Sequence, residues 1–507
     1  MNIKTAFADT GFIEYNLEPI FKPESMVVIG VSQKNYLSPG TTIFLKNLFE
    51  MKLGKRTYGI NPRGGTLETY KLYKDLRSLP ETPDVGVIAI PPKGALDAVK
   101  NCINLGIKGM IIISGGFAET GRQGQQIQDN IVKMCEDARI PLIGPNCVGI
   151  YHPPYIDTLF LPTEKLVLPE KGNVSIVSQS GGVLLDQFFL SFRERHIGIS
   201  SAVSIGNKAV VNEVHMLEYF TEDEETQVIS FYIEGFKKLE GREFLHRSRR
   251  TQKDIVIYQG GKSEVARSAV ESHTASLSSN FNISSAAFKQ YGIIQPQTEE
   301  EVLNYIKTYS ELARRRPKAN FTEYLQGKVA IVTVSGGHGV VCMDLLNKYY
   351  LSPVEFTNKE KQTMKKLINP TIKRIGSFNN PIDLTGAATD ADIINILKYL
   401  IELEKIDIIM LIVVPYPPAI TVQIGRRISL VARHHNKPLV CFVPYIEKYN
   451  LIRESLELNH IPVGHTVSET VQMAAAIRDK SRAVLRLSAN KIPDDMLAYY
   501  ESIQEER

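Results

Sequence analysis

His273 is the residue of this chain whose type and surroundings best suit covalent chemistry. It lies in a run of small residues, 271–276, that follows the turn Gly260-Gly261-Lys262-Ser263 and a short helix-like segment. A neutral imidazole is a competent nucleophile at about pH 7. A loop of small residues beside a helix start also lets the imidazole approach a phosphate. The sequence therefore predicts that His273 is a nucleophile acting on a phosphorylated group.

Glu234 is the candidate partner of this histidine. A nucleophilic imidazole needs an acceptor on its second nitrogen, which fixes the tautomer and stabilises the imidazolium. Glu234 follows the apolar run Val228–Ile233 and precedes Gly235, so we expect its carboxylate at the same sheet edge as the His273 loop. By residue type alone, a helix cap or a surface acid is the alternative interpretation of Glu234.

A third chemical feature joins the apolar run 173–177 to a predicted helix over 183–192. This segment, 178–182, places hydroxyls, small residues and free amides together at a helix N-terminus. The N–H groups and the helix dipole stabilise an anion there, by about 0.3–1 kcal/mol for the dipole alone. We therefore predict that a phosphate or carboxylate is bound by Ser178, Ser180, Gly181 and Gly182. The alternative is a serine N-cap followed by glycines that permit close helix packing.

Five turns in the first third of the chain place glycine, serine, proline or asparagine after an apolar run. The residues predicted to line a ligand site there are Gly30, Ser32, Pro62, Arg63, Pro91, Ser114, Gly115 and Asn146. Each turn alone is explained by turn chemistry, but their convergence at one sheet edge favours a binding site. The segment lacks a complete Gly-x-Gly-x-x-Gly pattern, so a standard nicotinamide site is not expected. A nucleotide-bearing ligand with extra phosphates suits Arg63 better.

Parallel sheets are needed to bring these turns together. Short β-branched runs alternate with Gly/Ser/Pro turns and amphipathic helices three times along the chain, which is typical of α/β units. The predicted strands are 26–31, 58–60, 85–90, 109–113 and 142–144, then 173–177, 200–205, 228–233 and 254–258, then 329–334, 406–414 and 439–443. We predict an α/β fold with domains at 1–150, 151–318 and 319–490, linkers near 150 and 318, and a polar tail over 491–507.

The composition bounds the class of protein. A chain of 507 residues with 43% hydrophobic and 22% charged residues is an ordinary globular protein of several domains. The net charge of +4 is small and the basic residues are scattered, so neither a nucleic acid nor an anionic membrane is an expected partner. The five cysteines are widely separated and never form a Cys-x-x-Cys pair, which argues against disulfides and against a metal site.

Targeting signals and the other histidines give no further function. The N-terminus has no apolar signal region and no apolar run approaches the roughly 18 residues of a membrane span, so a cytoplasmic protein is expected. Two histidines lie at a polar helix end and four among surface-like neighbours, and none of the six is expected to act. They are His434 and His435, and His152, His196, His215 and His246.

The order and spacing of six motifs resemble the alpha subunits of ADP-forming acyl-CoA synthetases, which are relatives of succinyl-CoA synthetase. The resemblance covers nearly the whole chain. Its motifs are Gly-Pro-Asn-Cys-Val-Gly (144–149), Ser-Gln-Ser-Gly-Gly (178–182), Gly-Asn-Lys-Ala (206–209), Tyr-Ile-Glu-Gly (232–235), Ser-His-Thr (272–274) and Asn-Pro-Ile-Asp-Leu-Thr-Gly (380–386). It implies a CoA-binding Rossmann-like domain followed by two flavodoxin-like parallel-sheet domains, the first of which carries a phosphohistidine loop.

The resemblance also implies a reaction and a role for each site. Acyl-CoA, phosphate and ADP would be interconverted with carboxylic acid, CoA and ATP, through an acyl phosphate and phosphorylated His273. Glu234 would hold the imidazole, the Ser178–Gly182 helix start would hold the phosphate, and the turns of the first domain would bind CoA. Phosphoryl transfer depends mainly on positioning and charge stabilisation, which helix N-termini and a neutral histidine supply.

The resemblance further implies a partner. Such synthetases contain an ATP-grasp domain that binds the nucleotide, and no such pattern occurs in this sequence. We therefore expect a separate beta subunit that carries ADP or ATP and magnesium, in an α2β2 assembly. A small carboxylic acid and its acyl-CoA are the expected substrates.

Several positions depart from the family pattern. The glycine-rich stretch expected after His273 is replaced by Ala275, Ser276, Ser279 and Phe281, which restrict the backbone more than glycine does. The other departures are Gln259 in place of lysine, Val210 and Asn212 in place of acids, and His338 in place of proline. The alternatives to an enzyme subunit are a CoA-sensing or acyl-CoA-sensing regulatory subunit that has lost turnover, and a non-catalytic scaffold.

Overall fold

The computed structural model describes residues 12–266, 280–315 and 323–489. By the contacts within it, the chain divides into two compact units, Met1–Ser285 and Ala286–Arg507. Unit 1 therefore contains the predicted first domain, 1–150, and residues 151–285 of the predicted second domain, whereas residues 286–318 of that domain fall in unit 2. The predicted linker near 318 lies outside the described residues, so that boundary stays a prediction.

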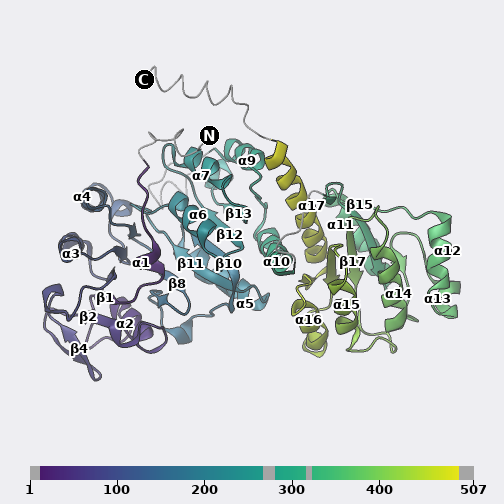
Figure 1. Ribbon diagram of the computed structural model, residues 1–507, viewed down its shortest axis with the longest axis horizontal. Coiled ribbons are helices and arrows are strands. Elements are labelled where there is room, and N and C mark those ends of the chain that lie inside the picture. Colours follow the sequence, from purple (N-terminus) through teal and green to yellow (C-terminus); the bar gives the residue numbers. More distant parts are fainter. Residues whose placement is uncertain (1–11, 267–279, 316–322, 490–507) are drawn as a thin grey trace, which may run out of the picture. The chain divides into compact units, whose positions relative to one another are not determined.

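The first sheet of unit 1 has seven strands, of which six run parallel (Figure 1). In order across the sheet they are β3 (Gly65–Leu67), β4 (Tyr70–Tyr73), β2 (Thr57–Ile60), β1 (Met26–Ile29), β5 (Val85–Ile88), β6 (Gly109–Ile112) and β7 (Leu142–Ile143). Only β3 is antiparallel to its neighbour. Strand order reverses at β1, because β2 lies on one side of it and β5 on the other.

Helices cover this sheet because its strands are apolar on both faces. All four residues of β1 are buried, as are those of β5 and β6, which is typical of strands between two helical layers. The helices are α1 (Glu18–Phe21), α2 (Pro39–Phe49), α3 (Pro92–Leu105) and α4 (Arg122–Ala138). Helix α4 buries Gly124, Gln128, Ile131 and Cys135, one stripe at helical spacing.

The second sheet of unit 1 has four parallel strands extended by two antiparallel ones. In order they are β13 (Asp254–Gln259), β12 (Val228–Ile233), β10 (Lys171–Ser178), β11 (Ile199–Ser204), β8 (Ile150–His152) and β9 (Ile156–Asp157). Its helices are a π-helical segment over Val183–Phe189, which continues as α5 (Leu190–Glu194), then α6 (Glu213–Glu222), α7 (Glu240–Ser248) and α9 (Phe281–Gln290). The sequence predicted neither β8 and β9 nor the π-helical turn.

Two histidines expected near the surface are buried in this half of the unit. His152 lies on β8, where its Nδ1 is 2.5 Å from the Ser201 hydroxyl of the neighbouring strand. His215 lies in the first turn of α6. Burial lowers the pKa of His152 and lowers that of His215 to about 4. Both rings are therefore neutral packing residues, and the expectation of surface positions was wrong for these two.

Backbone hydrogen bonds join the two sheets of unit 1. The amides of Asn207, Ala209 and Val211 donate to the carbonyls of Pro145, Gly144 and Leu142, at 2.9, 3.1 and 3.1 Å. The segment 207–211 follows β11 in the chain but lies along the end of β7. A buried ion pair adds a second joint, because Lys46 Nζ on α2 lies 2.6 Å from Asp157 Oδ2 on β9.

Unit 2 contains the third sheet, which is parallel throughout. In order it contains β15 (Ser352–Pro353), β14 (Lys328–Thr333), β17 (Ile408–Ile412), β18 (Leu439–Phe442) and β19 (Val463–Gly464), and β16 (Ile382–Asp383) also pairs with β14. Its helices are α10 (Glu299–Arg315), α11 (Gly336–Lys348), α12 (Asn358–Lys366), α13 (Pro370–Ile375), α14 (Asp390–Ile401), α15 (Ile424–Arg433), α16 (Asn450–Glu457) and α17 (Val467–Ala489). Within the described residues, no helix is both long enough and apolar enough to cross a membrane.

The Lys46–Asp157 pair gives a test of how the two sheets are joined. Lys46→Ala leaves a carboxylate that is fully buried and has lost its cation, so we expect the free energy of unfolding to fall by about 3–5 kcal/mol. Lys108→Ala is the matched control, because it breaks a pair whose lysine is largely exposed and which contributes about 0–1 kcal/mol. Urea unfolding of both variants measures the difference. Equal losses would contradict a buried, structural role for Lys46.

Candidate active site

The carboxyl edge of the first sheet collects all eight residues predicted to line a ligand site. Each of them follows a strand of this sheet, and these strands run parallel. Gly30 and Ser32 follow β1, Pro62 and Arg63 follow β2, Pro91 follows β5, Ser114 and Gly115 follow β6, and Asn146 follows β7. The turns after β1 and β5 flank the point where strand order reverses, which is where open α/β sheets bind their ligands.

Gly30 permits the close approach that builds this edge. Its φ is +111°, and a Cβ atom there would lie 2.5 Å from the carbonyl oxygen of Ala89. A Cβ on Gly40, in the first turn of α2, would lie equally close to the carbonyl oxygen of Gly30. The amide of Ser32 then donates to the Thr41 hydroxyl at 2.8 Å, which fixes the loop over the start of α2. The free amides of a helix N-terminus therefore face the end of β1.

Arg63 is a cation at this edge. Its side chain is exposed, and no carboxylate of the described residues lies within ion-pair distance of it. The turn that carries Arg63 is fixed by the side chain of Asn61. Its Nδ2 donates to the Val31 carbonyl at 2.8 Å, and its Oδ1 accepts the backbone N–H of Arg63 at 2.9 Å. An exposed guanidinium held beside the end of β1 is suited to a phosphate group.

Glu119 ties the turn after β6 to the second sheet. Its Oε1 accepts the amides of Gly116 and Phe117 at 2.6 and 3.2 Å, and its Oε2 accepts the Asn207 side-chain amide at 2.6 Å. Burial would raise the pKa of Glu119, but these hydrogen bonds outweigh burial and hold the pKa below its ordinary value. Asn207 also accepts a bond from Asn146 at 3.2 Å. Sequence reasoning missed both Glu119 and the role of Asn207.

Cys147, which follows Asn146, has no chemical role near neutral pH. Its thiol is buried and lies 3.3 Å from the carbonyl oxygen of Ile112. Burial raises the pKa of Cys147 to about 12, so the thiol stays protonated and is a poor nucleophile.

The carboxyl edge of the second sheet holds the predicted phosphate site after β10. Among the described residues no acceptor is found for the backbone amides of Ser180, Gly181 and Gly182. Ser178 is buried, and its hydroxyl donates to the Ser180 carbonyl at 2.6 Å, which shapes the turn. The π-helical segment then begins at Val183, and such wide turns are frequent at functional sites. Three N–H groups are thus presented at one helix start.

Glu234 lies next to this turn, because β12 pairs with β10. Its amide donates to the side-chain oxygen of Gln179 at 2.8 Å, and the amide of Gln179 donates to the Tyr232 carbonyl at 3.1 Å. Burial, together with the charge of the nearby Glu234 carboxylate, raises the pKa of the Tyr232 hydroxyl. Glu234 itself is 7% exposed. The alternative of a surface acid is therefore wrong, because the carboxylate is buried at the sheet edge.

His273 lies outside the described residues, but the residues that flank its segment are described. The strand β13 lies beside β12 and ends at Gln259, which pairs with Ile233. After the segment, Ser284 in the first turn of α9 donates its hydroxyl to the Gln259 side chain at 2.9 Å. Both the departure of the chain after β13 and its return into α9 are therefore anchored at the strand end next to Glu234.

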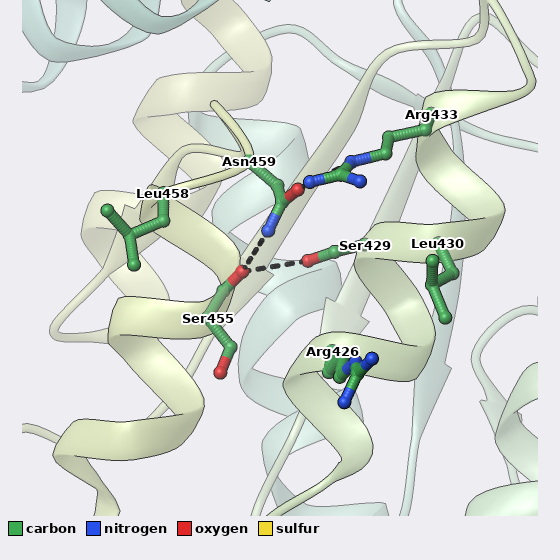
Figure 2. A pocket seen from close by; sticks show the side chains of 7 residues that line it. All are labelled: Arg426, Ser429, Leu430, Arg433, Ser455, Leu458 and Asn459. Atoms are coloured by element: carbon green, nitrogen blue, oxygen red, sulfur yellow. Dashed lines mark hydrogen bonds between the residues drawn. The ribbon is translucent and has the colours of Figure 1, made fainter.

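Two hollows on the described surface contain none of the predicted site residues. One, of about 330 Å³, lies between α15 and α16 in unit 2, where the Ser429 hydroxyl and the Asn459 amide both donate to the Ser455 carbonyl (Figure 2). The other, of about 520 Å³, lies beside α6 in unit 1 and is lined by Tyr15, Tyr219 and several glutamates. The candidate site is thus a set of turns along two sheet edges.

Comparison with known proteins assigns two segments of the chain to families. Residues 24–153 match a family model described as a CoA binding domain, and residues 171–309 match one described as a succinyl-CoA ligase like flavodoxin domain. Among solved structures, the apo form of the dinucleotide-forming acetyl-coenzyme A synthetase 1 of Ca. Korarchaeum cryptofilum is similar with a TM-score of 0.82. That match has 26% identity and covers 94% of this chain and 100% of the other. These matches define a CoA-ligase type of α/β chain.

Similarity over nearly the full length narrows that class. The alpha subunit of ADP-forming acetate–CoA ligase II of Pyrococcus furiosus is 30% identical over 477 residues, which cover 92% of this chain and 98% of that subunit. The alpha subunit of ADP-forming acetate–CoA ligase I of the same organism is 33% identical. That match covers 74% of this chain and 77% of the length of that subunit. The chain belongs to the family of alpha subunits of ADP-forming acyl-CoA synthetases, within the succinyl-CoA synthetase superfamily. The predicted fold class and the resemblance are confirmed.

Other relatives are longer than this chain. ADP-forming acetate–CoA ligase I of Archaeoglobus fulgidus is 32% identical over 401 residues, which are 79% of this chain but 55% of that protein. The chain therefore spans about half the length of some of the curated relatives it matches.

The two glycines at the predicted phosphate site give opposite predictions for stability. A Cβ on Gly181 would lie 2.3 Å from a methyl group of Val148, so Gly181→Ala should lower the free energy of unfolding by about 1–3 kcal/mol. Gly182 has helical φ and ψ of −62° and −49°, and a Cβ atom there would have no described atom within 4 Å, so Gly182→Ala should raise stability by about 0.4–1 kcal/mol. Urea unfolding tests both variants, and a stable Gly181→Ala chain would contradict the packing described.

Glu119 gives a prediction for pH. Because its folded pKa lies below the ordinary 4.5, ionised Glu119 stabilises the fold fully above pH 4.5, and this contribution is lost as the pH falls through the folded pKa. Glu119→Gln places an amide donor against Asn207 and should cost about 1 kcal/mol at neutral pH, a low value because the side chain is half-buried. The difference from the unaltered chain should shrink in acid. Unfolding measured across pH checks this, with exposed Glu164→Gln as the control; a difference independent of pH would contradict it.

Proposed function

We propose that this chain is the catalytic alpha subunit of an acyl-CoA synthetase. The enzyme uses the free energy of a thioester bond to form ATP, through phosphorylated His273. The observation that supports the proposal most directly is the juxtaposition on β10 and β12. Three backbone amides at Ser180–Gly182, for which no described acceptor is found, follow the strand next to the one that ends before Glu234. The side chain of Gln179 accepts the backbone amide of Glu234, whose carboxylate is buried. An anion-binding helix start beside a buried acid suits phosphoryl transfer to a histidine.

The proposed reaction has three balanced steps. Phosphate oxygen attacks the thioester carbonyl of acyl-CoA, so that the C–S bond breaks and acyl phosphate and CoA thiolate form. The imidazole of His273 then attacks the phosphorus, the acyl oxygen leaves as a carboxylate, and a P–N bond forms. Finally a terminal oxygen of ADP attacks the same phosphorus, which yields ATP and restores the neutral imidazole.

Glu234 and the amides of 180–182 have separate tasks in these steps. The carboxylate accepts a hydrogen bond from the imidazole nitrogen that does not attack. It also stabilises the imidazolium cation that forms when the other nitrogen attacks phosphorus. The amides hold the phosphate oxygens, whose charge is spread in the transition state, in a partly enclosed site where fixed dipoles are effective.

CoA binding is proposed for the carboxyl edge of the first sheet. The eight residues from Gly30 to Asn146 follow strands that end there, and the matching family model is a CoA binding domain. The exposed guanidinium of Arg63 would pair with a phosphate of CoA, and the start of α2 would face its diphosphate. Ser114, Gly115 and Asn146 lie on the side nearest the second sheet, where the thiol end of CoA must reach for the acyl transfer.

A partner subunit is part of the proposal. Both Pyrococcus furiosus relatives carry the name subunit alpha, and one of them is matched over 98% of its length. We propose that a beta subunit with an ATP-grasp domain binds ADP or ATP and magnesium, in an α2β2 assembly. The Korarchaeum relative has been solved with phosphate and ADP, in agreement with nucleotide use in such enzymes. A small carboxylic acid is the proposed acyl group, because the named relatives act on acetate.

Phosphorylation of the chain tests the proposal. Incubation with acetyl phosphate labelled with ³²P, without a partner, should give an acid-labile and base-stable label, and ATP with the beta subunit should give the same label. His273→Ala should abolish it, whereas His434→Ala, at an exposed histidine of unit 2, should not. Glu234→Gln should slow labelling by about 10²–10³-fold, because the imidazolium loses its counter-charge. Peptide mapping and rapid-quench kinetics measure both effects.

Failure to label the chain has a definite meaning as well. A chain that binds CoA in calorimetry but takes up no label from either donor would contradict the phosphohistidine relay. It would support instead a CoA-sensing regulatory or scaffold subunit that has lost turnover.

A further inference from the structure

Lys208 is a buried lysine that the proposed reaction does not use. It follows Asn207 in the turn after β11 and has a φ of +42°. Its side chain is 2% exposed, and its ammonium lies 2.7 Å from Glu213, 3.1 Å from Glu240 and 2.6 Å from the carbonyl oxygen of Gly235. The ammonium has three N–H groups, so all of them have acceptors.

These contacts bring three separate segments to one point. Glu213 begins α6 and Glu240 begins α7, where an acidic side chain is favoured by the helix dipole. Gly235 follows Glu234 at the end of β12. Burial alone would lower the pKa of Lys208, but the two carboxylates outweigh burial and raise it, so the ammonium stays charged. Lys208 is thus a permanent cation held beneath the strand end that carries Glu234.

The backbone around Glu234 is fixed at three successive residues. The carbonyl of Ile233 accepts the Gly260 amide at 2.8 Å, the amide of Glu234 donates to Gln179 at 2.8 Å, and the carbonyl of Gly235 accepts Lys208. The first of these bonds comes from the neighbouring strand's end and the second from the phosphate turn. The third bond comes from Lys208, which binds the carbonyl of Gly235, the residue after Glu234 and beyond the last paired residue of β12.

We propose that Lys208 is a positioning residue for Glu234, which it holds in place through the Gly235 carbonyl. The inference rests on the proposed function, because it gives Glu234 a reaction to be positioned for. Without the Lys208 bond, the Gly235 end of the strand loses its only described side-chain donor, and the carboxylate departs from the geometry needed to stabilise an imidazolium. A misplacement of about 1 Å costs of the order of 10²-fold in rate.

The test separates positioning from folding by removing charge in balanced pairs. Lys208→Met with Glu213→Gln removes one positive and one negative charge and deletes the bond to Gly235, while Glu240 keeps the Lys237 amide as a donor. Glu213→Gln alone is the matched control, because it keeps both the Lys208–Gly235 bond and the pair with Glu240. Lys46→Met with Asp157→Asn is the second control, a buried ion pair of the same unit without contact to β12.

The readout is the rate of ³²P transfer from acetyl phosphate to the chain, measured at saturating and sub-saturating donor, together with CoA affinity by calorimetry. The Lys208→Met, Glu213→Gln chain should transfer phosphate about 10–100-fold more slowly at saturation, with half-saturation and CoA affinity within about twofold of the unaltered chain. The two controls should keep their saturated rates within about threefold. A folded Lys208→Met, Glu213→Gln chain with an unchanged saturated rate would overturn the proposal.

A second variant covers the case in which methionine prevents folding. Lys208→Leu with Glu213→Gln places a shorter apolar side chain without any donor for Gly235 in the same space, while Glu240 keeps the Lys237 amide as a donor. It should fold and show the same loss of saturated rate. If neither variant folds, Lys208 belongs to the core of the unit and the proposal is overturned. An unaltered chain that takes up no label contradicts the proposed function instead, so the two failures are distinct.

Discussion

The shared direction of the strands is the constraint on which the rest of this structure depends. Six strands of the first sheet and four of the second run parallel, so the turns that follow them collect at two edges. Residues as distant in sequence as Gly30 and Asn146 therefore lie along the same sheet edge, although no local sequence signal links them. The central strands of the first sheet contribute buried apolar side chains, and the candidate site residues follow the strands, apart from Ser178, which is the last residue of β10.

The two edges form one site region because a segment of the second half is bonded to the first sheet. The amides of Asn207, Ala209 and Val211 donate to carbonyls of the segment 142–145, and these backbone bonds do not depend on side-chain identity. This explains how Val210 and Asn212 can depart from the family pattern without disturbing the joint. The side chains that matter in this segment are Asn207, which bonds to Glu119 of the CoA-binding half, and Lys208, which lies beneath Glu234.

Much of this arrangement was predictable because it follows from local patterns. The main strands lie within a few residues of their predicted ranges, since each is a β-branched run that ends in a turn, as in β12 at Val228–Ile233. Features that depend on distant pairing were not predictable. The strands β8 and β9 have only three and two residues, and the burial of His152 follows from the pairing of β8 with β11. The π-helical turn at Val183 depends on packing around it.

The site residues divide in the same way. Glu234 and the serine–glycine turn could be selected as candidates because a strand end next to small residues is visible in the sequence, and their roles stay predictions. Glu119 was not, because its partner Asn207 is 88 residues away and an acid in a surface turn has no distinguishing pattern. A lysine in a loop is usually exposed to solvent, so its residue type does not predict that Lys208 is buried. The only local indication is the pair of acids, Glu213 and Glu240, that begin α6 and α7. The roles of His273 and of the CoA turns stay predictions.

The opposite directions of Asn207 and Lys208 have a consequence for how this protein can change. Loops between elements generally accept insertions at little cost, and most turns of an α/β sheet are places where chain length varies. In this turn, neighbouring side chains serve different halves of the site, so one added or lost residue would exchange their directions and disconnect both. The length of the turn is therefore fixed by geometry, although the residues next to Asn207 and Lys208 in the sequence can be substituted. A chain cut or a circular permutation at this point would separate the turns of the first sheet from those of the second, even if both sheets still folded.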